Sequence, residues 1–308
     1  MTGSAPKIEN QHQTKEEQME LVREWVEYQS PAGSVAAFLA RPAPAKTPVP
    51  GVVVIQEVWG VDGHIADLAE RLASAGYLAL APDLYSAGGG RPPVLAPERV
   101  EAAKAFLNSI PPQQWMAVLG DEARRAEALG GLSPEEGTRV GETIGALFGG
   151  AGGDPSRHME VLQAALGYLQ AHPACAGRRI GSVGFCMGGG LSAQLACAEA
   201  GIAGAVVFYG ASPAAEDVAR VRCPVRGFYG ADDPRIVAGL TAFDEALEKA
   251  GCDRELRVYP ETPHAFFNDT RPSYRPEAAR DAWGRLLAFF AEVLGPVPTV
   301  PLADAART

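Results

Sequence analysis

The sequence predicts an α/β fold, a doubly wound and mostly parallel sheet with helices on both faces. Short apolar runs alternate with amphipathic segments of helical length, which is typical of parallel sheets. Four polar or reactive residues, Glu57, Cys186, Asp233 and His264, each follow such an apolar run. Because ligands bind at the carboxyl ends of the strands in open α/β sheets, we expect these side chains to share one edge of the sheet.

The chain of 308 residues, 47% of them hydrophobic, is long enough to bury a large core. We expect a polar N-terminal extension at 1–21, one α/β domain at 22–295 and a C-terminal tail at 296–308. An insertion at about 86–157 interrupts the domain.

In the first part of the domain, the sequence predicts three strands, then a helix and then another strand. In that helix, Ile65, Leu68 and Leu72 recur at helical spacing, and Gly76 is suited to end it. The expected elements are strands at 22–29, 34–41 and 51–57, a helix at 64–75 and a strand at 77–82.

From residue 158 onward the alternation resumes. Met159, Leu162, Leu166 and Leu169 lie on one face of a helix, and Gly251 ends a later helix. The expected elements are a helix at 158–171, a strand at 179–185, a helix at 187–199, strands at 204–209 and 224–229, a helix at 236–250, a strand at 255–259 and a helix at 276–293.

The insertion at 86–157 lacks this alternation. It contains the glycine run 88–90 and helix-prone pieces at 97–108 and 120–129. Long segments of this kind within compact domains are usually functional. We expect a lid or wall over the functional edge of the sheet, with a flexible hinge near 149–153. The alternative is a surface insertion that touches no substrate.

Residues 184–188, Gly-Phe-Cys-Met-Gly, have the pattern of a nucleophile elbow with cysteine at its tip. In such an elbow a strand turns sharply into a helix, so that Gly184 and Gly188 are needed for the chain to pass. The N-terminus of the helix then favours a thiolate or an oxyanion at Cys186. Glycine-flanked cysteines also occur as simple packing residues. The pattern therefore indicates a catalytic cysteine only if an acid and a histidine accompany it.

An acid and a histidine follow in the expected order. Asp232 and Asp233 end one predicted strand, and His264 lies in the loop after the next. The order nucleophile, acid, histidine is that of the α/β-hydrolases. We assign the acid to Asp233, because Asp232 is suited to cap the turn.

Two further motifs complete a resemblance to a known family. They are Gln56-Glu57-Val58-Trp59-Gly60 and Ala81-Pro82-Asp83-Leu84-Tyr85. With the elbow and the Pro-His-Ala-Phe loop, they resemble the dienelactone hydrolase family (carboxymethylenebutenolidase-like), a branch of the α/β-hydrolase fold with a cysteine nucleophile. The resemblance extends from about residue 50 to about residue 293.

The resemblance implies a hydrolase that opens a lactone or cleaves a small carboxylic ester through a Cys-His-Asp triad and a thioester acyl-enzyme. Cys186 would attack, His264 would move the proton and Asp233 would orient the imidazole. The backbone N–H of Met187, next to the nucleophile, is a natural oxyanion donor.

The family implies two more roles and leaves the substrate open. It implies the N–H of Val58 as the second oxyanion donor and Glu57 as a contact of the resting thiol that controls its ionisation. We expect Trp59, Tyr85 and Phe266 to line the substrate pocket, although Trp59 and Tyr85 also suit the core.

The arginines with which the family binds a substrate carboxylate are replaced here by Ala87 and Asn268. Because paired arginines are the natural partners of a carboxylate, the replacement leaves neutral or bulkier esters and thioesters open. A non-catalytic protein that senses ligands or redox state is a more distant alternative. Four arginines are available as substitutes from neighbouring loops: Arg91, Arg235, Arg271 and Arg275.

Composition argues against several other classes of protein. A net charge of −10 argues against nucleic-acid binding. No run approaches the roughly 18 apolar residues of a membrane span. The first residues lack an apolar signal region, and the five scattered cysteines suit a reducing compartment rather than disulfides or zinc. We therefore expect a cytoplasmic protein with a small ester or lactone as its partner and with no metal or cofactor.

Overall fold

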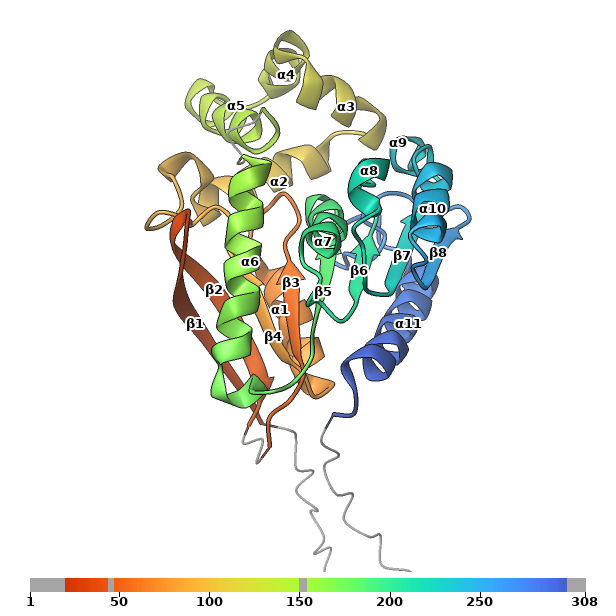
Figure 1. The fold of residues 1–308 in the computed structure, drawn as a ribbon. Helices are drawn as coiled ribbons and strands as arrows, with labels where there is room; N and C mark the ends of the chain where they lie inside the picture. The colour runs from red at the N-terminus through yellow and green to blue at the C-terminus, as the bar shows by residue number, and fades with distance from the viewer. Residues whose placement is uncertain (1–19, 44–46, 150–153, 298–308) are drawn as a thin grey trace, which may run out of the picture.

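The computed structural model describes residues 20–43, 47–149 and 154–297, and they form a single eight-stranded sheet with helices on both faces (Figure 1). The strand order is β1-β2-β4-β3-β5-β6-β7-β8. The first two pairings, β1 with β2 and β2 with β4, are antiparallel, and all the others are parallel. The predicted fold class is therefore confirmed. The strands are β1 (Leu21–Ser30), β2 (Gly33–Pro42), β3 (Gly51–Ile55), β4 (Leu78–Pro82), β5 (Ile180–Phe185), β6 (Ala205–Phe208), β7 (Val225–Gly230) and β8 (Arg254–Tyr259).

Two hydrophobic cores lie on opposite faces of the sheet. On β3, Val53 and Ile55 belong to one core and Val52 and Val54 to the other, as the two-residue period of a strand requires. Five long helices cover these faces. Helices α6 (Pro155–Ala171), α7 (Met187–Ala198) and α10 (Leu240–Lys249) pack on the first core, and α1 (Gly63–Ser74) and α11 (Pro276–Leu294) pack on the second.

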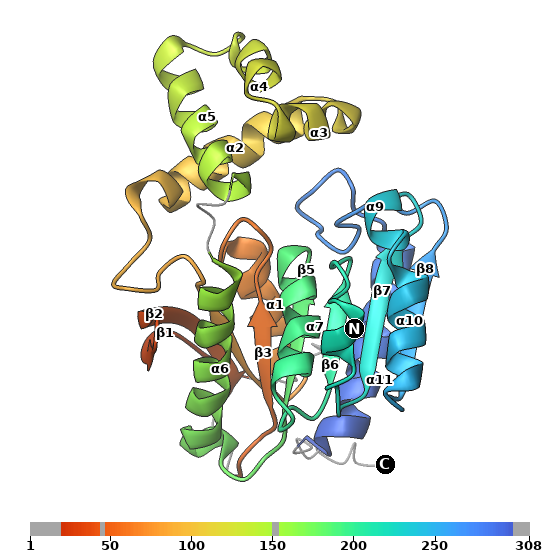
Figure 2. The same ribbon diagram turned by 45° about the horizontal axis from the view of Figure 1, so that its top comes forward.

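The insertion at 86–157 is mostly helical and stands beyond the carboxyl ends of the strands (Figures 1 and 2). The helix expected at 97–108 is present as α2. The helix expected at 120–129 is present as α4, which begins at Glu122 because the side chain of Asp121 accepts hydrogen bonds from the N–H groups of Ala123 and Arg124. The elements of the insertion are η1 (Pro93–Leu95), α2 (Pro97–Ser109), α3 (Pro112–Gly120), α4 (Glu122–Leu129) and α5 (Pro134–Phe148).

Helices α3 and α5 were not expected. Both begin with proline at the first helical position, a favourable place because its missing N–H has no intrahelical partner to lose. Ser133 caps α5 through the N–H of Glu136. The hinge expected at 149–153 lies, apart from Gly149, outside the described residues.

Other departures are local. The helix expected at 236–250 is two helices, α9 (Pro234–Val237) and α10, separated at Ala238 and Gly239. Strand β3 ends at Ile55, two residues before its predicted end, because Gln56 and Glu57 already belong to the following loop. The short helices η2 (Pro173–Cys175) and α8 (Ala215–Val218) were not expected.

A third hydrophobic core joins the insertion to the edge of the sheet. Leucines, valines and aromatic residues of η1, α2 and α5 pack in it with three residues of the predicted site, Val58, Trp59 and Tyr85. Met187 packs against the same cluster. The insertion is thus anchored directly on the segments that carry the site.

Candidate active site

Cys186 stands at the junction of β5 and α7, as the elbow pattern predicts. Its backbone has a φ of 54° and a ψ of −114°, a conformation that residues other than glycine rarely adopt. Two hydrogen bonds hold the turn: the Cys186 N–H donates to the carbonyl of Phe208 at 3.0 Å, and the Gly189 N–H donates to the carbonyl of Cys186 at 3.0 Å.

The flanking glycines are required by close backbone approaches. A Cβ atom on Gly184 would collide with the carbonyl oxygen of Gly188. A Cβ atom on Gly188 would collide with the carbonyl oxygens of Ile55 and Gln56, at the end of β3. The elbow is therefore wedged against the loop that carries Glu57 and Val58.

The structure brings Asp233 and His264 together. Asp233, the residue before α9, is buried, and its Oδ2 lies 2.5 Å from Nδ1 of His264. Asp232 is exposed, and its N–H donates to the carbonyl of Thr262. Of the two aspartates, only Asp233 is therefore in a position to orient the imidazole.

His264 also interacts with Cys186. Burial alone would lower the pKa of His264, but the negative charge of the Cys186 thiolate and hydrogen bonds with Asp233 and Cys186 raise it to about 10. An imidazolium ion is thereby favoured at His264 at neutral pH. The ring of Tyr209 packs edge-on against the imidazole, with ring centroids 5.1 Å apart.

Glu57 is buried at the same edge, and its two oxygens have separate partners. Tyr209 donates its hydroxyl to Oε1 at 3.2 Å, and Asn268 donates its Nδ2 amide to Oε2 at 2.9 Å. Burial, followed by the charges of Glu57 and Cys186, raises the pKa of Tyr209 well above its usual value. The carboxylate of Glu57 and the thiol of Cys186 therefore lie within electrostatic reach of the same hydroxyl. Sequence reasoning missed Tyr209, although it follows β6 at the same sheet edge as the other candidates.

The two predicted oxyanion donors lie on adjoining segments. Met187 is the first residue of α7, where N–H groups have no intrahelical acceptor. Val58 is held by Tyr85, whose hydroxyl donates to the Val58 carbonyl at 2.7 Å. Tyr85 thus positions the loop that bears Val58.

The predicted pocket residues have different surroundings. The ring of Trp59 is buried and packs against the guanidinium of Arg271, whose central carbon lies 5.1 Å from the ring centre. Phe266 is fully buried in the core, where its ring contacts Tyr209 and Tyr259. Its predicted place in the pocket wall stays a prediction.

Among the four candidate arginines, only Arg271 is a buried residue close to the site. Arg91 forms an ion pair with Asp83, with Nε and Oδ2 2.5 Å apart. Arg235 and Arg275 are exposed. Arg271 is 7% exposed, and the charges of Glu57 and Cys186 act on it.

The remaining cysteines are poor nucleophiles. Burial raises the pKa of Cys175 and Cys197 to about 11 and that of Cys223 to about 12. Burial also raises the pKa of Cys252, which is half-buried. Because only the thiolate attacks, these four thiols are poorly reactive at neutral pH.

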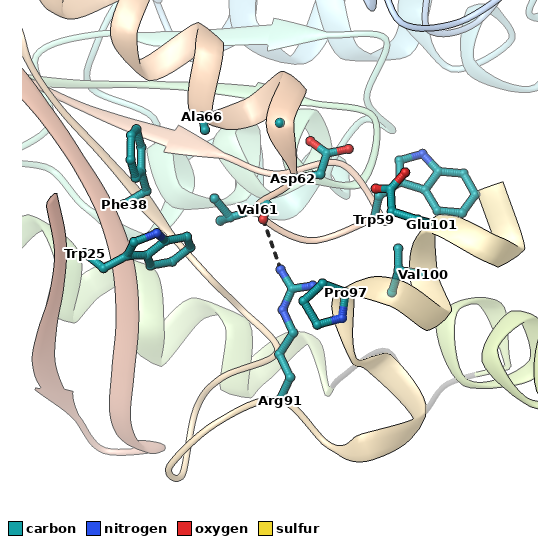
Figure 3. Close-up of a pocket in the computed structure, with 11 residues that line it drawn as sticks. Trp25, Phe38, Trp59, Val61, Asp62, Ala66, Arg91, Pro97, Val100 and Glu101 are labelled. Atoms are coloured by element: carbon teal, nitrogen blue, oxygen red, sulfur yellow. Dashed lines mark hydrogen bonds between the residues drawn. The ribbon is translucent and has the colours of Figure 1, made fainter. Parts of the chain in front are cut away.

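A cavity of about 320 Å³ lies beside the site and shares only Trp59 with it. Figure 3 shows Trp25 and Phe38 on one side and Pro97, Val100 and Glu101 of the insertion on the other. Cys186, His264 and Glu57 are absent from its walls, so this cavity is separate from the reactive groups.

Within the described ranges, no three side chains of histidine, cysteine, aspartate or glutamate gather as a metal site would require. No helix in the described part of the chain is long and apolar enough to cross a membrane.

Comparison with known proteins extends these observations. Residues 35–294 match the model of the dienelactone hydrolase family. A protein of Saccharolobus solfataricus with the provisional name carboxymethylenebutenolidase is 35% identical over 267 residues, which cover 86% of this chain and 97% of that protein. A protein of Yersinia pestis with the same provisional name is 30% identical over 274 residues, 85% of each chain.

A solved structure supports the same relationship. The crystal structure of a protein from Klebsiella pneumoniae, provisionally named dienelactone hydrolase, superposes with a TM-score of 0.65 at 28% sequence identity. The match covers 89% of this chain and 99% of that one.

Proposed function

This chain belongs to the dienelactone hydrolase family, a family of hydrolases, and on that premise we propose that it opens a lactone or cleaves a small carboxylic ester with Cys186 as nucleophile. The observation that carries the proposal is the chain of contacts from Cys186 through His264 to Asp233. Each member follows a different strand of the sheet, so the fold itself assembles the three groups.

The reaction begins with the Cys186 thiolate, whose proton is held by His264. The sulfur attacks the ester carbonyl and forms a C–S bond, while the carbonyl electron pair moves to oxygen. When the C–O bond to the leaving group breaks, His264 gives its proton to the departing alkoxide and a thioester remains on Cys186. In a lactone the alcohol stays attached to the acyl group.

The second half restores the starting Cys186 thiolate and protonated His264. Neutral His264 takes a proton from water, and the hydroxide oxygen adds to the thioester carbonyl. The C–S bond then breaks, the carboxylic acid leaves, and the pair of Cys186 and His264 is regenerated. Asp233 stabilises the charged imidazole in both halves.

The N–H groups of Met187 and Val58 are proposed to bind the oxyanion in both tetrahedral intermediates. One such donor typically contributes about 3–4 kcal/mol of transition-state stabilisation. The hydrogen bond from Tyr85 to the Val58 carbonyl fixes this loop before a substrate binds. We assign to Glu57 an electrostatic role, in which its carboxylate controls the ionisation of the Cys186 thiol. This role is in keeping with its burial and with the hydrogen bonds that it accepts from Tyr209 and Asn268.

We further propose that the insertion at 86–157 covers the reaction site, that 22–295 forms one domain and that the protein works in the cytoplasm. The first point is supported by the shared hydrophobic core of the insertion and the loop at Val58 and Trp59. The last is supported by five cysteines without disulfide partners, which suit a reducing compartment.

Turnover of p-nitrophenyl acetate and of a neutral lactone by wild type and Cys186→Ala tests the proposal. We expect both reactions to depend on Cys186. A folded Cys186→Ala variant with full turnover would remove cysteine from the mechanism. Wild-type protein with no turnover of any ester would favour a ligand-binding or redox-sensing role.

A further inference from the structure

The cavity of about 320 Å³ beside Trp59 is formed by parts of the chain that are far apart in sequence. Trp25 of β1 and Phe38 of β2 stand on one side, Trp59 follows β3, and Pro97 and Val100 belong to α2 of the insertion (Figure 3). This volume is at the lower end of the range for small-molecule sites, which are mostly apolar and carry few polar groups. The cavity therefore suits a molecule built on a single aromatic ring.

Trp25 gives the cavity a preformed wall that is open to solvent. The side chain is 57% exposed. Its ring is nevertheless held in place by Phe38, with ring centroids 5.8 Å apart and an angle of 64° between the ring planes. Edge-to-face pairs of this kind are favourable. A ligand can thus reach the cavity from the side of Trp25.

The charged residues around the cavity are already paired. Nζ of Lys104 lies 2.8 Å from Oδ2 of Asp62 and 2.8 Å from Oε1 of Glu101. Nε of Arg91 lies 2.5 Å from Oδ2 of Asp83. An ionic ligand would leave water without an unpaired charge to meet it, which is unfavourable. The walls therefore favour a neutral molecule over an anion or a cation.

Arg91 offers one polar contact to such a molecule. Among the described residues, its hydrogen bonds use Nε, which donates to Asp83, and Nη2, which donates to the carbonyl of Val61 at 3.2 Å (Figure 3). Nη1 thus remains able to donate to an oxygen atom of a ligand. The cavity combines aromatic walls with one hydrogen-bond donor.

We propose that this cavity is a binding site, distinct from the reactive groups, for a neutral aromatic molecule that carries one hydrogen-bond acceptor. The ring packs against Trp25 and Trp59, and the acceptor oxygen receives a hydrogen bond from Nη1 of Arg91. Because Cys186 and His264 do not line the cavity, the molecule is held there without being hydrolysed, and its binding does not depend on the proposed reaction.

Three molecules of nearly the same shape and different charge test the ligand class: neutral acetophenone, the benzoate anion and the benzamidinium cation. We expect acetophenone to bind about 10-fold or more tightly than either ion, because the paired side chains leave both ions without a partner. In α-methylstyrene a methylene group replaces the carbonyl oxygen. It should bind about 3- to 10-fold more weakly than acetophenone, the range expected for one hydrogen bond.

Binding is measured by NMR on the indole N–H signals of the isotope-labelled protein. Trp25 and Trp59 line the cavity, so their signals should shift as acetophenone is added and then reach a plateau. Trp283, which lies on α11 and does not line the cavity, is the internal control.

Two variants test the place of binding. Ala66→Phe fills the cavity from α1 and should weaken acetophenone binding by about 10-fold or more. Trp25→Ala, at an exposed position, removes one wall and should weaken binding by about 5-fold or more. Ala242→Phe makes the same substitution as Ala66→Phe in a hollow on α10 and should bind like wild type. Urea unfolding of each variant checks that it is folded.

Three outcomes would overturn the inference. They are unmoved signals of Trp25 and Trp59, wild-type affinity in a folded Ala66→Phe or Trp25→Ala variant, and equal affinity for acetophenone and either ion. Equal binding of acetophenone and α-methylstyrene would overturn the contact with Arg91.

Discussion

Asp233 and His264 lie 31 positions apart in the chain, yet Oδ2 of the one is 2.5 Å from Nδ1 of the other. Asp233 follows β7 and His264 follows β8, two neighbouring parallel strands. Because parallel neighbours end at the same edge, their following loops meet there. This pairing leaves the other imidazole nitrogen for Cys186 and the substrate.

The pairing predicts unequal roles for the two adjacent aspartates. Asp233→Asn should lower kcat by about 10³- to 10⁴-fold, because the imidazole loses its orienting carboxylate. Asp232→Asn is the matched control and should have little effect, since Asp232 is exposed. His264→Ala should cost at least as much as Asp233→Asn. Steady-state kinetics on one ester measure all three, and a larger loss in Asp232→Asn would reverse the assignment of the acid.

The pKa of His264 gives a second prediction. A pKa raised from 6.5 to about 10 means that the imidazolium persists at neutral pH and is lost as the pH rises through about 10. The stability that this shift contributes is present in full below pH 6.5 and disappears over the same rise. In Cys186→Ala the pKa of His264 should fall, because the thiolate charge and its hydrogen bond are removed. Titration of the imidazole by NMR measures this change, and an unaltered pKa would exclude the ion pair.

Glu57 should restrain the reactivity of the thiol. Its carboxylate disfavours a second negative charge nearby, so that Glu57→Gln should speed the reaction of Cys186 with iodoacetamide at pH 7. The amide of glutamine can still accept one of the hydrogen bonds from Tyr209 and Asn268. Asp232→Asn removes an exposed charge and serves as the control. A slower reaction in Glu57→Gln would show that the carboxylate assists thiolate formation instead.

The elbow should tolerate no side chain at Gly188. Gly188→Ala places a Cβ atom against the carbonyls of Ile55 and Gln56, and we expect a loss of about 2–3 kcal/mol in the free energy of unfolding. Gly284→Ala, on α11 with open space around it, should instead stabilise the protein by about 0.5–1 kcal/mol. Urea unfolding monitored by circular dichroism compares the two. A neutral Gly188→Ala would mean that the elbow can move away from β3.

The sequence was sufficient for the sheet and for the approximate positions of the reactive residues. The period of apolar residues located the strands, and the rule that parallel strands end at one edge predicted that Cys186, Asp233 and His264 would lie near one another. The elbow was visible because close backbone contacts demand glycine at 184 and 188. Those signals are local in the chain.

The contacts between the insertion and the sheet could not be predicted in the same way. Arg271 meets Trp115 across 156 positions, and Tyr209 meets Glu57 across 152. Such pairs depend on how α3 and the loops fold together, and no local pattern marks them. The burial of Phe266 was hard to predict for a related reason, because an aromatic residue beside a reactive histidine suits a pocket wall and the core equally well.

The most direct test of the account is mass spectrometry of the acyl-enzyme formed with p-nitrophenyl acetate after rapid acid quenching. We predict one acetyl group on wild-type protein, located by peptide mapping on Cys186 and released on further incubation. Cys186→Ala should carry none, while Cys252→Ala, which removes a half-buried thiol away from the triad, should be labelled like wild type. An acetyl group on another residue, or wild-type turnover that persists in Cys186→Ala, would contradict the central claim.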